Sequence, residues 1–203
     1  MALYHRDLKF IYLFEPHTAS RAILEHLPKY VQGTAKINHH HIGIQEMTNW
    51  RKSILKPKDA LEARVVCTVR NPLDTLLTRW RVGAFKDVSF RRFFDNQKDN
   101  PQIVNPAMGL YLEAEYFCWY EDLEADLRWM FNRDELTLGW DDRHKTKGKE
   151  EWYTYYEKDM VDYLCDLYKA YLKRFGYNIE FTDGRPVCHL DTDIRAQLCQ
   201  KLI

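Results

Sequence analysis

Two stretches of this chain combine residue types that could hold a phosphate-bearing ligand. The first lies between the apolar run 10–14 and a helical pattern, so free main-chain N–H groups at the helix start point outward from its positive end. Small or polar residues dominate this stretch, which comprises Pro16, His17, Thr18, Ala19, Ser20, Arg21 and Ala22. It lacks the Gly-x-x-x-x-Gly-Lys-Ser/Thr pattern of the usual triphosphate cradle, and nothing in it marks a magnesium ligand. A plain strand-to-helix turn is the alternative interpretation.

The second stretch pairs a guanidinium with a hydroxyl. Arg70 ends a β-branched run, and Thr78 lies two turns into the helix expected after Pro72. Because an α-helix repeats every 3.6 residues, the Thr78 hydroxyl can turn toward the end of the strand. A guanidinium fork together with a hydroxyl suits a phosphate, so this pair is a candidate second phosphate site.

Two further clusters carry titratable side chains. His39, His40 and His41 are adjacent, so they cannot all point at one metal ion from a regular strand or helix, and a metal site is disfavoured. Hydrogen bonding in a surface loop and proton transfer by one of the three both stay open for this run. The basic stretch 144–149 is a second cluster, and a solvated loop is its simplest interpretation.

The elements that must position these groups follow from hydrophobic periodicity. Short apolar or β-branched runs predict three strands, at 9–15, 64–69 and 116–120. Helical patterns follow them, at 20–30, from 72 to beyond 80 and at 123–131, and a longer one covers 150–175 and ends at Gly176. Alternating strands and helices predict an α/β fold, a single domain with a mainly parallel sheet flanked by helices on both faces. Ligands of such sheets bind beyond the carboxyl ends of the strands.

The composition narrows the class of protein. With 203 residues the chain can bury one substantial core, and its 30 basic residues balance 30 acidic ones. A chain without net charge offers no strong field for nucleic acid or an anionic membrane, so the expected partner is a small charged ligand. The five cysteines lack metal-ligand spacing, and no apolar run suits a signal peptide or a membrane span, which favours a reducing cytoplasm.

Four segments, taken in order, resemble the sulfotransferase family. Residues 16–22 are similar to its loop for the 5′-phosphosulfate of 3′-phosphoadenosine 5′-phosphosulfate (PAPS). Residues 70–78 are similar to its Arg-Asp/Asn-Pro-x-Asp-(x)₃-Ser segment for the 3′-phosphate, with threonine at the last position. Residues 120–123 and 175–177 look like two further family segments, so the resemblance spans about 9–177.

The resemblance implies a P-loop NTPase-like sulfotransferase fold and a PAPS-dependent enzyme that needs no metal. Such an enzyme transfers a sulfuryl group to a hydroxyl or amine and releases 3′-phosphoadenosine 5′-phosphate (PAP). The acceptor is expected to be a small molecule or a carbohydrate. Two alternatives stay open: a nucleotide-binding protein of the same fold without turnover, and a P-loop-like kinase, which the missing Lys-Ser/Thr pair disfavours.

Individual roles follow from the same resemblance. His17 stands where the family usually has a lysine beside the leaving phosphate, so the cation would come from protonated His17 or from Arg21. His41 matches a family histidine that takes the acceptor's proton. Lys145 and Lys147 belong to the basic stretch, which in the family can close over the 3′-phosphate.

Overall fold

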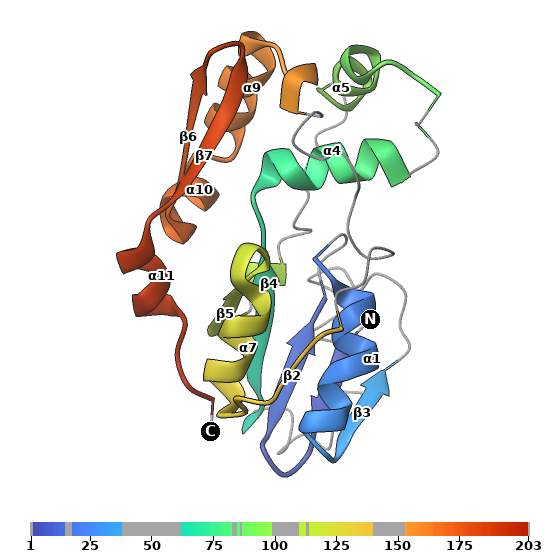
Figure 1. Ribbon diagram of the computed structural model, residues 1–203, viewed down its shortest axis with the longest axis vertical. Coiled ribbons are helices and arrows are strands. Elements are labelled where there is room, and N and C mark those ends of the chain that lie inside the picture. Colours follow the sequence, from blue (N-terminus) through green and yellow to red (C-terminus); the bar gives the residue numbers. More distant parts are fainter. Residues whose placement is uncertain are drawn as a thin grey trace. The chain divides into compact units, whose positions relative to one another are not determined.

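The computed structural model describes residues 2–14, 18–37, 62–82, 85, 87–98, 110–112, 114–139 and 153–202 (Figure 1). The chain forms two compact units. The first unit consists of Met1–Val69, Ala107–His144 and Leu198–Ile203, and the second unit contains the remaining residues. The expectation of a single domain stays a prediction.

A five-stranded sheet lies at the centre of the first unit. Its strands are β1 (Ala2–His5), β2 (Phe10–Leu13), β3 (Thr34–Ile37), β4 (Arg64–Val69) and β5 (Tyr116–Trp119), in the order β3-β1-β2-β4-β5. The pairs β2–β4 and β4–β5 are parallel, whereas β1 pairs antiparallel with both β2 and β3. Among the described strands of this sheet, four run in one direction and β1 runs against them. This confirms an α/β fold with a mixed sheet of mostly parallel strands.

Three of these strands match predicted ones. Strand β4 has the predicted bounds, and β2 and β5 are each shorter than the predicted run. Strands β1 and β3 have no predicted counterpart.

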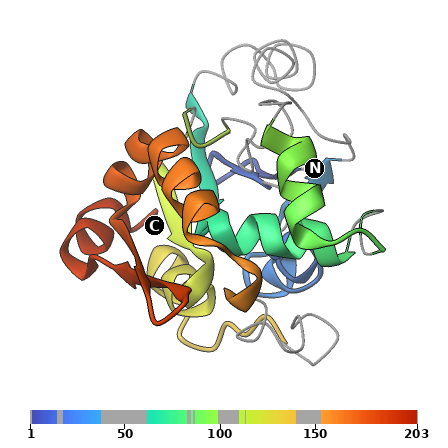
Figure 2. The ribbon, with the colours of Figure 1, turned by 90° about the horizontal axis from the view of Figure 1, so that it is seen from above.

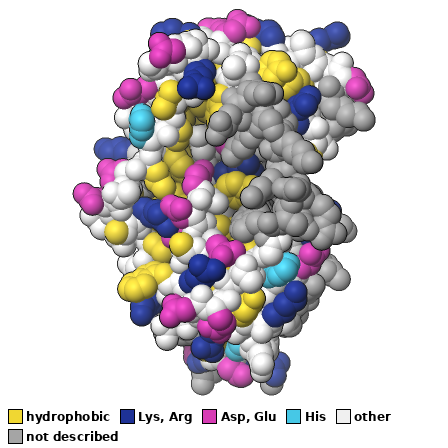
Figure 3. All heavy atoms as spheres, in the orientation of Figure 1, with side chains coloured by type: hydrophobic (Ala, Val, Ile, Leu, Met, Phe, Trp, Pro, Cys, Tyr) yellow, Lys and Arg dark blue, Asp and Glu magenta, His cyan; other side chains and the backbone are white. Residues whose placement is uncertain are grey.

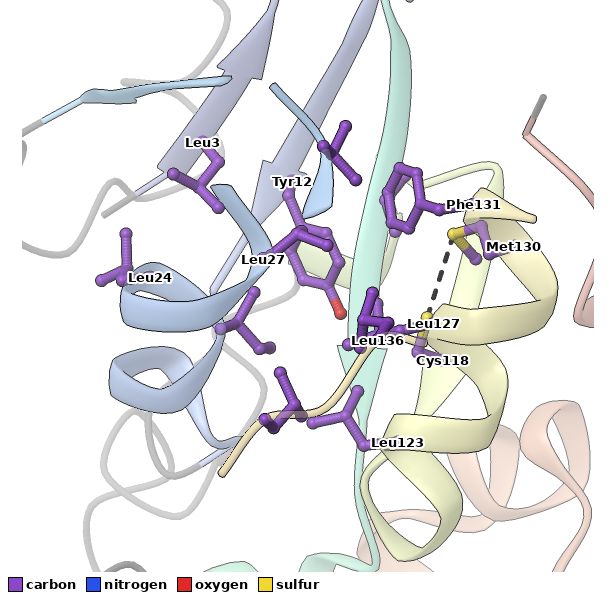
Figure 4. Packing of buried hydrophobic residues seen from close by; sticks show 14 of the residues in the cluster. Leu3, Tyr12, Leu24, Leu27, Cys118, Leu123, Leu127, Met130, Phe131 and Leu136 are labelled. Atoms are coloured by element: carbon purple, nitrogen blue, oxygen red, sulfur yellow. Dashed lines mark hydrogen bonds between the residues drawn. The ribbon is translucent and has the colours of Figure 1, made fainter. Parts of the chain in front are cut away.

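Helices α1 (Ser20–Tyr30) and α7 (Leu123–Phe131) pack against one face of this sheet (Figure 4). Both have the predicted bounds. Leu27 of α1 and Leu127 of α7 are fully buried in one cluster with Phe10 and Tyr12 of β2. Burying a large apolar side chain contributes about 1.5–3 kcal/mol, so this cluster fixes α1 firmly against the strand that precedes it.

The second unit is built on α4 (Pro72–Val82), α5 (Phe90–Lys98) and α9 (Lys158–Leu167). Helix α5 is the neighbour of α4 in both ribbon views (Figures 1 and 2). The Phe90 ring of α5 joins the two neighbouring segments, because its centroid lies 5.2 Å from that of Trp80 in α4 and 4.8 Å from that of Tyr156, just before α9. Aromatic contacts of this kind add to the burial of the apolar core.

Within the predicted helical range 150–175, the described residues 153–175 form several pieces rather than one helix. The short helix η3 (Tyr153–Tyr155) precedes α9, and α9 is separated from α10 (Lys169–Phe175) at Tyr168, whose ψ of 12° leaves the helical range. The predicted end is confirmed. Gly176 caps α10 in the left-handed conformation with φ 73°, which glycine adopts without steric cost.

The chain beyond Gly176, where no element was predicted, is regular. It forms a hairpin of β6 (Tyr177–Thr182) and β7 (Arg185–Leu190), followed by α11 (Thr192–Leu198). The two turn residues, Asp183 and Gly184, both have positive φ, at 52° and 76°. Asp-Gly in this conformation is a common two-residue hairpin turn.

The surface carries both signs of charge. On the face shown in Figure 3, Lys and Arg side chains are interspersed with Asp and Glu, in keeping with the balanced composition. None of the described helices is long and apolar enough to cross a membrane.

Candidate functional site

The loop before α1 has an unusual backbone at its last residue. Ala19, the N-cap of α1, is left-handed with φ 62° and ψ 21°, which costs a residue other than glycine roughly 1–2 kcal/mol. An alanine also has no side-chain oxygen to accept a hydrogen bond from the first-turn N–H groups. The first turn of α1 contains no acidic residue. Such a helix start suits an anion held by main-chain N–H groups.

The neighbouring predicted residues differ in exposure. Thr18 and Ala22 are buried, Ser20 is half-buried and Arg21 is exposed. Ala22 faces the core cluster, so it supports the loop rather than offering a side chain to a ligand. Arg21 lies in the first turn of α1, where its charge reinforces the positive end of the helix.

The turn between β4 and α4 is tightly ordered. The Leu73 amide donates to Asn71 Oδ1 at 3.0 Å, and the Thr75 amide donates to the Asn71 carbonyl at 3.0 Å. Pro72 occupies the first helical position, where its missing N–H costs no hydrogen bond. These bonds fix the direction in which the chain leaves Arg70.

Arg70 and Thr78 meet, as helix geometry predicted. Arg70 Nη2 donates to Thr78 Oγ1 at 3.1 Å. The guanidinium also forms an ion pair with Asp74, in which Nε donates to Asp74 Oδ2 at 2.6 Å and Nη2 lies 2.5 Å from the same oxygen. The Arg70 and Asp74 side chains are only 3% and 2% exposed. Burying two charges costs desolvation energy, and their mutual attraction offsets this cost only when both side chains are held in good geometry.

Tyrosine hydroxyls from later in the chain complete this cluster. Tyr171 of α10 accepts a hydrogen bond from the Arg70 amide at 3.1 Å and donates to the Arg70 carbonyl at 3.0 Å. Tyr153 donates to Asp74 Oδ1 at 3.3 Å. Neither tyrosine is among the predicted site residues, because each belongs to an aromatic helical pattern that indicates a core face.

The parallel strands of the first unit's sheet end at one edge. Because β2 and β4 are parallel neighbours, with Leu13 paired to Cys67, their carboxyl ends lie at the same edge of the sheet. The loop before α1 follows β2, and Arg70 directly follows Val69, the last residue of β4. Strand β5 ends at this edge too and leads through η2 (Tyr120–Asp122) into α7. This edge is where ligands of α/β sheets usually bind.

Several predicted residues lie outside the described part of the chain. They are Pro16, His17, His41, Lys145 and Lys147, together with the two other histidines of the run. Among the described residues, no group of three or more His, Cys, Asp or Glu side chains could hold a metal ion. All five cysteines are free, and Cys67 and Cys118 are buried.

Comparison with known proteins finds no matching family model, no similar curated protein and no similar solved structure.

Proposed function

We propose that this protein is a sulfotransferase that binds PAPS and transfers its sulfuryl group to an acceptor hydroxyl or amine. In this proposal the first turn of α1 contacts the 5′-phosphosulfate. Arg70 and Thr78 contact the 3′-phosphate, the group that distinguishes this nucleotide from ATP. The acceptor belongs to the class of small molecules or carbohydrates.

The observation that carries the proposal is the hydrogen bond between Arg70 and Thr78. The family-like segment assigns these two residues, eight positions apart, to one phosphate, and their side chains lie at 3.1 Å. Arg70 Nε and Nη2 donate to Asp74 and Thr78, and the Thr78 hydroxyl donates to the Asp74 carbonyl at 2.9 Å. A bound phosphate would exchange some of these hydrogen bonds for its own, while the two side chains stay where they are and lose little conformational freedom. The left-handed Ala19, which provides no side-chain cap for α1, supports the assignment of the 5′-phosphosulfate to this helix start.

The proposed chemistry is in-line transfer that depends on positioning and charge. The acceptor oxygen or nitrogen attacks sulfur while the bond from sulfur to the 5′-phosphate oxygen breaks, and PAP leaves. The acceptor's proton passes to His41. Main-chain N–H groups at the start of α1, with Arg21 or protonated His17, stabilise the negative charge that grows on the departing phosphate.

Thermal melts with PAP and with ATP test the binding half of the proposal. A ligand at 100 times its Kd stabilises the native state by about 2.7 kcal/mol, which corresponds to a rise of about 5–10 °C in Tm for a chain of this size. PAP is expected to reach this rise at micromolar to millimolar concentration, and ATP to need at least about tenfold more.

Arg70→Lys is the matched variant, because it keeps the charge that Asp74 requires but loses the planar fork. It should weaken PAP binding by about tenfold or more. Arg91→Lys is the control, since Arg91 pairs with the exposed carboxylates of Asp95, Glu157 and Asp159 elsewhere in the second unit. Equal protection by PAP and ATP, or unchanged PAP binding by Arg70→Lys, would contradict the 3′-phosphate assignment.

Transfer from labelled PAPS to a panel of hydroxyl and amine acceptors tests the catalytic half. His41→Ala should lower the rate by about 10² to 10⁴ and leave PAP affinity unchanged, because a general base acts on the acceptor. If PAP binds but no acceptor is labelled, the protein binds the nucleotide without turnover.

A further inference from the structure

The Tyr171 hydroxyl holds both main-chain groups of one residue, Arg70. It accepts from the Arg70 amide at 3.1 Å and donates to the Arg70 carbonyl at 3.0 Å, although the two residues are 101 positions apart. Arg70 lies between the end of β4 and the start of α4, outside the regular hydrogen bonding of either element. A buried peptide group in such a place needs another partner, and a single hydroxyl provides it on both sides of Arg70.

Tyr171 is itself firmly held. Its side chain is buried, and its ring stacks on Tyr177 with an interplanar angle of 3° and a centroid distance of 6.2 Å. The Phe175 ring lies 4.8 Å away. Gly176 ends α10 between these two aromatic residues and turns the chain into β6. The hydroxyl is therefore presented by a packed aromatic cluster within the second unit.

Tyr153 acts on the other partner of the guanidinium. It donates to Asp74 Oδ1, while Arg70 Nε and Nη2 both contact Asp74 Oδ2. The two carboxylate oxygens are thus shared between a tyrosine and the arginine, which fixes the plane of the carboxylate and, through it, the guanidinium.

We infer that Tyr171 and Tyr153 are positioning residues that hold Arg70 ready for the 3′-phosphate of the nucleotide. This inference rests on the proposed function. Tyr171 fixes the backbone of Arg70, and Tyr153 fixes the carboxylate that orients its side chain. Neither tyrosine touches the ligand. They are expected to determine how strongly the protein prefers a nucleotide with a 3′-phosphate over one without it.

Calorimetric titration with two nucleotides tests this role. PAP carries the 3′-phosphate, and adenosine 5′-monophosphate differs from it only in lacking that group. Tyr171→Phe should weaken PAP binding by about tenfold and leave adenosine 5′-monophosphate binding within about twofold, so the ratio of the two affinities falls. A purely structural loss would weaken both nucleotides alike. Tyr153→Phe should lower the same ratio by a smaller factor, because its hydrogen bond is longer.

Tyr163→Phe is the matched control. Tyr163 lies on α9 and contacts Phe94 and Lys98 through its ring, and the described part of the chain gives its hydroxyl no hydrogen bond. This variant should keep the wild-type affinity ratio. Far-UV circular dichroism and a thermal melt establish that each variant is folded, and if Tyr171→Phe is not, Tyr153→Phe decides the test.

The outcomes separate the two proposals. If the wild type binds PAP no better than adenosine 5′-monophosphate, the 3′-phosphate site itself is wrong and the inference falls with it. If the wild type prefers PAP but the folded tyrosine variants keep the full preference, the positioning role is wrong and the proposed function stands. A preference lost in both tyrosine variants but kept in Tyr163→Phe supports the role.

Discussion

Breaking the Arg70–Asp74 ion pair from either side should destabilise the protein strongly. Both side chains are almost fully buried, at 3% and 2% exposure, and two guanidinium nitrogens lie within 2.6 Å of one carboxylate oxygen. Removing one member leaves the other as a buried charge without its counterion. Such a loss costs about 3–5 kcal/mol. For a chain of this size the corresponding drop in Tm is about 6–20 °C.

The double variant distinguishes buried charge from lost packing. Asp74→Leu and Arg70→Met each leave one buried charge without its counterion. The double variant leaves no buried charge at this site and keeps an apolar side chain at both positions. The combination should therefore cost less than either single change, by about 1–4 kcal/mol. The free energy of unfolding in urea at pH 7, followed by far-UV circular dichroism, measures all three variants.

An exposed ion pair of the same spacing provides the control. Arg91 and Asp95 are also four residues apart on a helix, but their side chains are 42% and 49% exposed. Asp95→Ala should cost less than about 1 kcal/mol, because water replaces the lost partner. The reasoning is refuted if Asp74→Leu costs no more than Asp95→Ala, or if the two single costs in the Arg70–Asp74 pair simply add.

Three further predictions concern other parts of the molecule. Leu202→Ala should lower the free energy of unfolding in urea by about 2–5 kcal/mol, because Leu202 is buried in the first unit's core and its amide donates to the Met130 carbonyl. Lys201→Ala is the control and should change the same free energy by less than about 1 kcal/mol. Burial raises the pKa of the Tyr12 hydroxyl well above its usual range. Above about pH 10 the unfolded chain therefore loses this proton while the folded chain keeps it, so the free energy of unfolding falls as pH rises. Tyr12→Phe should make that fall shallower by up to about 1.4 kcal/mol per pH unit, and an unchanged slope would show that the hydroxyl ionises in the folded state. His17→Lys should extend sulfuryl transfer to higher pH in the labelled-PAPS assay, because a lysine keeps its charge well above neutral pH. If this variant changes neither the rate nor its pH dependence while Arg21→Ala abolishes transfer, His17 is not the cation beside the leaving phosphate.

The elements that the sequence predicted well are those marked by local signals. Helices α1 and α7 and strand β4 have their expected bounds, because apolar spacing distinguishes a helix face from a strand within a few residues. Pro72 marks the start of α4, and Gly176 marks the end of α10 through its left-handed backbone. The β6–β7 hairpin was not predicted, although the Asp183-Gly184 pair at its turn is a local signal that could have indicated it.

In the candidate site, too, local contacts were predictable from the sequence and long-range contacts were not. Helix geometry predicted that the Thr78 hydroxyl can turn toward the strand end that carries Arg70, and the structure places it 3.1 Å from Arg70 Nη2. The contacts of Tyr171 and Tyr153 depend on segments 101 and 79 positions away, and no local pattern specifies which of many tyrosines reaches the turn. The sequence therefore determined which chemical groups stand at the strand ends. Only the tertiary structure decided that Arg70 is buried against Asp74 and held at its backbone, because burial and long-range hydrogen bonds arise when distant elements pack together.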